Sequence, residues 1–355
     1  MQLKTCAASD PVPEAFFQLP RELAVEDPHA LPPDPAAETS ALRAVNARLT
    51  WIEDNGIPLA RCATGLRPDP HTAWIGHFAA RNHPEAVTQL FSAVEGDLQS
   101  QGVRRIFGPL NADTWHDYRL NLNPAAAPPF LREPWNPPYY PKLWEQNAYP
   151  ICDRYHTARI RDLPAALERL SPFLRRLKRQ GCTLTPLNPR AFPAELDRLH
   201  ALSLNIFNDN PHYTPIDADA FHALYARTRS LLLPDLCLFC RDPRGNDVGF
   251  VFAYPDDIAA VRAMRGQRTL PARLRFLVNR RRDRLCIKSL GCTPETRGTG
   301  VGPALMAAVL QVAIRRRFPE ALMCLMHDDN DSRRLDGGTS EPFREYALYA
   351  KDLTP

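Results

Sequence analysis

The chain has 355 residues, 44% of them hydrophobic and 24% charged, with a formal net charge of +4 at pH 7. A chain of this length buries a full core and has room for two domains of ordinary size. The small net charge, carried by short local basic runs, disfavours a nucleic-acid partner, and the apolar runs are too short to span a membrane. Nine cysteines at irregular positions indicate reduced thiols, and no secretory signal is visible, so we expect a cytoplasmic protein without a membrane partner.

Proline is unusually frequent, with 36 residues concentrated in two stretches. Residues 11–39 hold seven prolines and no clear periodicity, which predicts an extended N-terminal arm over residues 1–39. Residues 123–150 hold eight prolines together with Trp135 and Trp144. A solvated linker would not carry such large aromatic side chains, so we predict an ordered loop that packs on the domain.

The first half alternates between strands and a helix. Strands are predicted at 57–66, 72–80, 103–111 and 152–160, and a helix at 84–102. These elements predict a compact mixed sheet in a domain over residues 40–160. A connecting helix over residues 161–181 follows, with Asp162 as its N-cap, an interruption at Pro172 and an end at Gly181.

The second half, residues 182–355, has a longer series of elements. The pattern predicts a strand at 182–187, helices at 193–208 and 217–232, a hairpin at 235–256, a strand at 285–294, a helix at 303–318, and strands at 321–330 and 343–352. The same order recurs, less completely, in the first half.

Three glycines at alternate positions, Gly298, Gly300 and Gly302, lie between the strand at 285–294 and the helix at 303–318. Pro303 fits the first turn of that helix, and arginines lie at its C-terminal end, where the helix dipole favours cations. Backbone amides at a helix N-terminus bind anions, and glycine lets a phosphate approach the backbone closely. The loop therefore predicts a phosphate-binding site.

The spacing of the loop decides which phosphate site it resembles. Proline and alanine follow Gly302 where a P-loop needs lysine, and Pro303 occupies the third glycine position of a dinucleotide fingerprint. The spacing that fits is Arg-x-x-Gly-x-Gly, formed by Arg297, Gly300 and Gly302. This pattern, with the strand order around it, resembles the acyl-CoA signature of the GNAT superfamily of N-acyltransferases.

The resemblance covers residues 40–355 and includes MHDDNDS (326–332) and FREYALYAKD (343–352). It implies an α/β (α+β) fold with two GNAT-like mixed central sheets flanked by helices, in tandem. The first half has ARNHPEAV (80–87), without glycine, where the second half has the loop. The resemblance therefore implies a degenerate domain followed by an acyltransferase domain, with acyl-CoA bound by the second.

The resemblance also implies a set of binding residues for acetyl-CoA or another acyl-CoA, and no metal. The pyrophosphate would be bound by the backbone amides of Arg297, Gly298, Thr299, Gly300, Val301 and Gly302. The pantetheine arm would pair with the strand edge at Leu290, Gly291 and Cys292, and Asn330 would hold pantetheine or orient the thioester. An amine would then attack the thioester directly, without a covalent enzyme intermediate.

The sequence offers more than one candidate for the general acid and the general base. His327, Asp328 and Asp329 end the fifth strand near the expected thioester, and histidine titrates in the useful range, so His327 is the preferred base. A packed histidine at the strand end fits the pattern equally well, and for the aspartates helix capping is favoured. Many members of the superfamily carry a tyrosine acid on the helix after this strand. In this sequence the segment after the strand at 321–330 has no tyrosine until Tyr346. Tyr346 and Tyr349 are possible substitutes, but they face opposite sides of a strand, so at most one can point into the site. The catalytic candidates are His327, Asp328 and Tyr346.

Asn205, Asn208 and Tyr213 lie between the first two helices of the second half, where they could bind a small-molecule amine acceptor or cap the helices. A nucleophilic Cys292 and a zinc site at Cys237 and Cys240 are disfavoured. Two other functions remain open: an acyl-CoA-binding pseudoenzyme, and a transferase whose donor is an aminoacyl-tRNA or a carrier protein bound by the basic insert at 262–284. The identity of the acceptor, the acyl chain length and the oligomeric state are not encoded in any pattern of the sequence.

Overall fold

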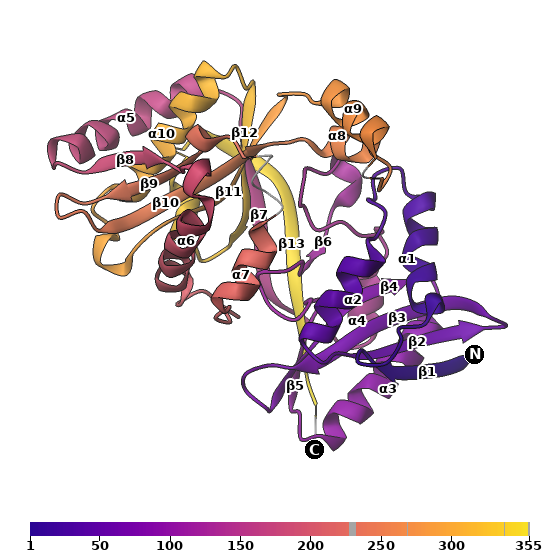
Figure 1. Cartoon of the computed structure of the whole chain (residues 1–355). Helices are drawn as coiled ribbons and strands as arrows, with labels where there is room; N and C mark the ends of the chain where they lie inside the picture. The colour runs from indigo at the N-terminus through magenta and orange to yellow at the C-terminus, as the bar shows by residue number, and fades with distance from the viewer. Residues whose placement is uncertain (227–231, 268, 337, 354–355) are drawn as a thin grey trace. The chain divides into compact units, whose positions relative to one another are not determined.

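The computed structural model describes residues 1–226, 232–267, 269–336 and 338–353, which form two compact units (Figure 1). Unit 1 comprises Met1–Arg154, Ile258–Asn279 and Arg344–Pro355, and unit 2 comprises Tyr155–Asp257 and Arg280–Phe343. In the described residues, no helix combines the length and the apolar character that a membrane crossing requires.

Unit 1 is built on a sheet with the strand order β1-β2-β3-β4-β5-β13. Its elements are β1 (Gln2–Ala7), α1 (Glu14–Glu26), α2 (Pro35–Ala44), β2 (Arg48–Asp54), β3 (Ile57–Leu66), β4 (Thr72–Ala80), α3 (Pro84–Ser100), β5 (Arg105–Gly108), β6 (Leu120–Asn121), α4 (Tyr140–Gln146), α8 (Ile258–Ala263), α9 (Leu270–Asn279) and the second part of β13 (Ser340–Asp352). Neighbouring strands are antiparallel except β4 and β5, which are parallel and joined by α3.

Unit 2 repeats this arrangement with the strand order β8-β9-β10-β11-β12-β7. Its elements are α5 (Leu163–Arg179), β8 (Thr183–Pro186), α6 (Phe192–Phe207), α7 (Ala218–Tyr225), β9 (Cys237–Arg241), β10 (Asp247–Pro255), β11 (Arg284–Cys292), α10 (Val301–Arg315), β12 (Glu320–His327) and the second part of β7 (Ile151–Ile160). Among the described residues of this unit, β11 and β12 are parallel and joined by α10, and the other neighbouring strands are antiparallel. The predicted α/β fold class is therefore confirmed.

The last strand of each sheet comes from the other half of the sequence. Residues Tyr155–Ile160 of β7 pair with β12 in unit 2, although the sequence pattern assigns this strand to the first domain. Residues Tyr346–Asp352 of β13 pair with β6 and β5 in unit 1, although the pattern assigns them to the second domain. The division of the chain thus differs from the predicted boundaries because β7 and β13 are exchanged.

Helix α5 is part of unit 2 rather than a free connector. Its apolar face joins the core of this unit, and it packs along α10, as Figure 1 shows. The Asp162 carboxylate accepts a hydrogen bond from the Ala165 amide, which confirms the predicted N-cap. The predicted interruption at Pro172 is wrong: the helix continues, and the Ser171 hydroxyl donates to the Glu168 carbonyl (3.0 Å), the acceptor that the missing proline N–H leaves free.

The prediction of an extended N-terminal arm is also wrong. Strand β1 and helices α1 and α2 occupy most of it, because Phe16, Phe17 and Leu19 pack into unit 1 and Asp34 caps α2 just before a proline in its first turn. The prediction of an ordered proline-rich loop is confirmed, since Trp144 is fully buried and the Trp135 indole donates to Asp27 (2.7 Å). The predicted helix at 217–232 begins as α7, and residues 227–231 lie outside the described residues.

A buried ionic cluster fastens α2 to the sheet of unit 1. The Glu38 carboxylate accepts hydrogen bonds from Arg61 of β3 (2.8 Å) and pairs with His77 of β4 (2.9 Å). Burial alone would raise the pKa of Glu38, but the charges and hydrogen bonds of Arg61 and His77 lower it to about 2. Because the folded pKa is depressed, the cluster stabilises the fold above about pH 4.5, and this contribution is lost as the pH falls towards 2.

We therefore expect Glu38→Gln to lower the stability of the protein at neutral pH and to reduce the loss of stability on acidification. Urea unfolding at neutral pH and at about pH 3 measures both effects. Glu22→Gln is the matched control, because Glu22 forms a more exposed pair with Arg81. If Glu38→Gln and Glu22→Gln showed the same pH dependence, the assignment of this contribution to Glu38 would be wrong.

Candidate functional site

The glycine loop lies between β11 and α10 in unit 2. Gly298 and Gly300 have φ values of 76° and 99°, in the left-handed region where residues with a side chain are strained, and Gly300 is the N-cap of α10. A Cβ atom at Gly300 would also lie 3.1 Å from the Phe173 ring of α5. Helix α10 is buried along most of its length, so its N-terminus is held rigidly at the loop.

Hydrogen bonds within the loop change the predicted set of amide donors. The amides of Arg297 and Thr299 donate to the carbonyls of Pro294 and Thr296, so the prediction that they bind a pyrophosphate is not supported. Val301 and Gly302 lie in the first turn of α10, where amides have no helical acceptor. The amides that suit an anion are therefore those at the helix start, together with the Gly300 N-cap.

The side chain of Arg297 has a different function in the loop. Its guanidinium donates to the Asp209 carboxylate (3.0 Å) and to the Ile206 carbonyl in the last turn of α6 (3.2 Å). A cation at the C-terminal end of a helix is favourable because of the helix dipole. Arg297 therefore ties the glycine loop to α6, which also contacts the end of β11: a Cβ at Gly291 would lie 2.4 Å from Ile206.

Strands β11 and β12 separate beside this loop. Their parallel pairing runs from Arg284 and Glu320 to Ile287 and Met323, and no later pair joins them in the described residues. On its other edge β11 remains paired with β10 as far as Cys292. The predicted residues Leu290, Gly291 and Cys292, all partly buried, thus lie on a strand whose edge towards β12 has no ladder partner.

The equivalent position in unit 1 is closed. After the parallel pairing of β4 and β5, the Leu110 amide donates to the Ile75 carbonyl (2.8 Å), and the Asn111 side chain accepts from the His77 amide (2.6 Å). Gly76 lies so close that a Cβ there would be 2.2 Å from the Leu110 oxygen. Helix α3 begins with a His83 cap instead of a glycine loop. The separation of two parallel strands and the glycine loop beside it therefore occur together in unit 2.

The end of β12 brings together polar groups from β7 and from the following turn. The His156 Nδ1 of β7 lies 2.8 Å from the Asp328 carboxylate, and the Asp329 amide donates to the His327 Nδ1 (3.1 Å). The His327 ring packs edge-on against Tyr155. His156 lies opposite Met326 in the β7–β12 pairing, beside the part of β12 that has separated from β11. The sequence pattern missed His156, because its proximity to Asp328 depends on the exchanged strand.

A bulge shapes this end of β12. The pairing with β7 shifts between Met323 and Met326, and Leu325 has a φ of 60°, which is rare for a leucine. The Leu325 amide donates to the hydroxyl of the buried Thr157 (3.1 Å). The bulge re-aims the residues before His327 while Thr157 satisfies the displaced amide.

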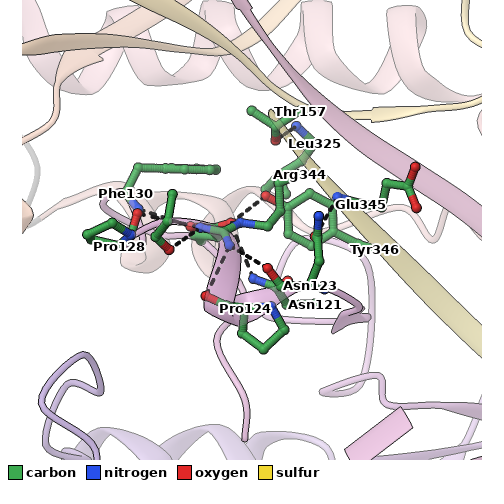
Figure 2. Close-up of polar contacts among 12 residues, drawn as sticks. Asn121, Asn123, Pro124, Pro128, Phe130, Thr157, Leu325, Arg344, Glu345 and Tyr346 are labelled. Carbon is green, nitrogen blue, oxygen red and sulfur yellow. Dashed lines mark hydrogen bonds and ion pairs between the residues drawn. The ribbon is translucent and has the colours of Figure 1, made fainter. Parts of the chain in front are cut away.

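Tyr346 lies in unit 1, within a buried polar cluster that Figure 2 shows. Its hydroxyl donates to the Glu133 carboxylate (2.6 Å), which also accepts from the Arg344 guanidinium (2.8 Å). Tyr346 is fully buried, so these contacts favour a structural role over the predicted catalytic acid. Tyr349, on the opposite face of β13 as predicted, is equally buried, and burial raises the pKa of its hydroxyl strongly.

The remaining predicted residues lie at the end of α6, on two turns of unit 2 and at the end of β11. Asn330 caps a short helical turn by accepting from the Ser332 amide (2.9 Å). Asn205 and Asn208 are exposed at the C-terminal end of α6, and Tyr213 follows in the next turn, half-buried. Burial raises the pKa of the Cys292 thiol, which argues against a nucleophilic thiolate.

Comparison with known proteins places this geometry in a fold family. No family model matches the chain. Escherichia coli (strain K12) protein YghO is similar, with 22% identity over 370 residues, which cover 96% of this chain and 93% of that protein. A tandem GNAT protein from the clavulanic acid biosynthesis pathway superposes with a TM-score of 0.55 at 12% identity, covering 100% of this chain and 99% of that one. A GCN5-related N-acetyltransferase from Sphaerobacter thermophilus superposes with a TM-score of 0.50 at 15% identity, and the match covers 99% of this chain and 96% of that one.

These identities are low, so the comparisons define the fold. The chain has the tandem GNAT fold, as the glycine loop and the strand order predict.

Proposed function

We propose that this protein is an N-acyltransferase that moves an acyl group from acyl-CoA to an amine. One observation carries the proposal: β11 and β12 separate after Ile287 and Met323, directly beside a glycine loop at the N-terminus of a buried helix. A free strand edge can pair with the amide groups of a pantetheine arm, and the helix start can bind its pyrophosphate. The closed equivalent position in unit 1 supports the assignment of the donor to unit 2.

The donor residues follow from this geometry. The amides of Gly300, Val301 and Gly302 bind the pyrophosphate, and Gly298 gives the loop its turn. The edge at Leu290–Cys292 pairs with pantetheine. Asn330 remains a candidate for the thioester end, as the resemblance implies.

The proton transfer is assigned to His156 and Asp328. When His156 Nδ1–H donates to Asp328, the Nε2 lone pair is left to accept a proton. In the reaction a C–N bond forms between the amine and the acyl carbon, the C–S bond breaks, and the proton lost by the amine reaches the departing thiolate through the base. His327 at the end of the same strand is the second candidate for this role.

We expect His156→Gln to lower the turnover of acyl transfer about 100-fold, because a positioned general base contributes on that order. The affinity for acetyl-CoA should be unchanged, since His156 is not among the donor residues. His222→Gln is the matched control: His222 also pairs with an aspartate at 2.8 Å in unit 2, but on the exposed surface of α7. Equal turnover of the two variants would exclude His156 as the base and leave His327→Gln as the next test.

The direct test of the function is the release of CoA thiol from acetyl-CoA in the presence of a broad panel of amines. Tight binding of acetyl-CoA by calorimetry without thiol release against any amine would instead favour an acyl-CoA-binding protein without catalysis. The burial of Tyr346 and Tyr349, which leaves neither as an accessible acid, is the observation that favours this second candidate.

A carrier-bound donor has a separate test. Replacement of Arg280, Arg281 and Arg282 by glutamine should leave turnover with free acyl-CoA intact under the proposal. If the triple variant kept its activity with acyl-CoA but lost activity with an aminoacyl-tRNA or an acyl-carrier protein, the natural acyl donor would be the tRNA or the carrier protein.

A further inference from the structure

Helix α9 exposes an unusual set of aliphatic side chains. Leu270, Leu274, Leu277 and Val278 have exposed fractions of 79%, 63%, 63% and 75%. Ala272 and Phe276 of the same helix are buried, and the helix packs on α8 within unit 1. The helix is therefore anchored through one face while it presents large apolar side chains on another.

The helical spacing places these side chains in one sector. At about 3.6 residues per turn, the four aliphatic residues fall within about 100° of the helix surface, opposite the buried pair Ala272 and Phe276. Arg273 and Arg275, both exposed, lie next to this sector on either side. An apolar stripe bordered by cations is the pattern of a helix that lies in a membrane interface.

The charge of the surrounding segment is strongly one-sided. Residues 262–284 contain nine arginines and one aspartate. Some of these arginines are used within the fold: Arg262 donates to the His29 carbonyl, and Arg280 pairs with Asp257. Arg273 and Arg275, by contrast, form no ion pair within the part of the chain that the structure describes, so their charges are available to an external anion.

We propose that α9 docks this protein on an anionic lipid surface. The aliphatic side chains project from a convex helix, and a bilayer interface accepts such side chains without a complementary shape. A protein-binding surface would be expected to carry aromatic or methionine side chains at its centre, whereas this sector holds leucine and valine alone. Arginines at its border can keep their charged ends at the headgroups while their stems follow the apolar surface.

This inference is independent of the proposed acyl transfer. The expectation of no membrane partner rested on the lack of a spanning segment, and an interfacial helix needs none. It also gives the basic insert a function that does not require a carried donor.

The test is co-sedimentation of the full-length protein with phosphatidylcholine vesicles, either alone or with about 30% phosphatidylglycerol. The wild-type protein should sediment with the anionic vesicles. The double variant Leu274→Ser, Leu277→Ser should bind them at least about tenfold more weakly, and Arg273→Gln, Arg275→Gln about fivefold more weakly for each charge removed. Val25→Ser is the matched control, since Val25 is an 87% exposed aliphatic residue of α1, and it should bind as the wild type does.

Three results would overturn the proposal. The first is equal sedimentation with and without vesicles, and the second is vesicle binding that survives the double leucine replacement. The third is a wild-type dimer in solution that Leu274→Ser, Leu277→Ser converts to a monomer, because the stripe would then be a protein interface. Because vesicle binding needs no acyl-CoA, and the affinity of each variant for acetyl-CoA reports an intact unit 2, failure here is distinct from failure of the proposed acyltransferase function.

Discussion

Replacing Gly300 by valine will lower the affinity of the protein for acetyl-CoA about 1,000-fold. Gly300 has a φ of 99° as the N-cap of α10, and a side chain there meets the Phe173 ring. Valine would shift the loop and the first amides of the helix away from the position that suits a pyrophosphate. Hydrogen bonds to a charged group contribute about 1.5–3 kcal/mol each, so the loss of two of them accounts for an effect of this size. Isothermal titration calorimetry measures it.

Gly245→Val is the control for backbone strain. Gly245 also has a positive φ, 88°, in the turn between β9 and β10, and its Cβ position is open. Both variants place a valine at a similar positive φ and so carry comparable backbone strain, but only Gly300→Val should lose acetyl-CoA binding. An acetyl-CoA affinity that stays the same in Gly300→Val would remove the glycine loop from the donor site.

Replacing Arg344 by methionine will destabilise unit 1 by about 3–5 kcal/mol, the range for a buried ion pair that loses one partner. The guanidinium and the Glu133 carboxylate are both fully buried. Arg344 also donates to the carbonyl of Asn123 (Figure 2). It donates to the carbonyl of Ala127 as well. Methionine would leave the carboxylate uncompensated. Urea unfolding measures the loss.

The pH dependence and a double variant separate charge from packing in this cluster. Burial raises the pKa of Glu133 even beside Arg344, and removal of the guanidinium raises this pKa further. The native state then holds a proton that the unfolded chain has lost, so the loss of stability should be larger at about pH 8 than at about pH 5. The double variant Arg344→Met, Glu133→Leu should recover part of the lost stability, because no carboxylate is then left uncompensated. Arg104→Met at an exposed arginine is the control and should lower the free energy of unfolding by no more than about 0.5 kcal/mol. A cost below about 1 kcal/mol for Arg344→Met alone would contradict the assigned role.

Local patterns predict the glycine loop and the helix that follows it well. Gly300, Pro303 and the apolar face of the helix act within a few residues of one another, and the structure has α10 at Val301–Arg315 where the pattern predicts 303–318. The helices in the N-terminal arm, by contrast, depend on contacts between residues far apart in the sequence, so the local pattern predicts an extended arm instead. Its prolines lie mostly outside the helices or at their ends, and α1 packs through Phe16 against Trp51 of β2 and Arg61 of β3, distant residues that no local pattern contains.

Long-range pairing explains what the sequence could not predict at the candidate site. Strands β7 and β13 have clear strand patterns, but nothing in them determines which sheet they join. Because β13 pairs with β5 and β6, Tyr346 reaches Glu133 of unit 1, and because β7 pairs with β12, His156 reaches Asp328, 172 residues away in sequence. The polar groups around His156 and Tyr346 are therefore harder to predict from the sequence than the glycine loop.

The central claim is that unit 2 binds acyl-CoA between β11 and β12. A crystal structure of the protein soaked with CoA tests it most directly. The account predicts density for the pyrophosphate at the amides of Gly300–Gly302 and for pantetheine along Leu290–Cys292. Density for CoA at another position, such as the start of α3 in unit 1, would contradict it.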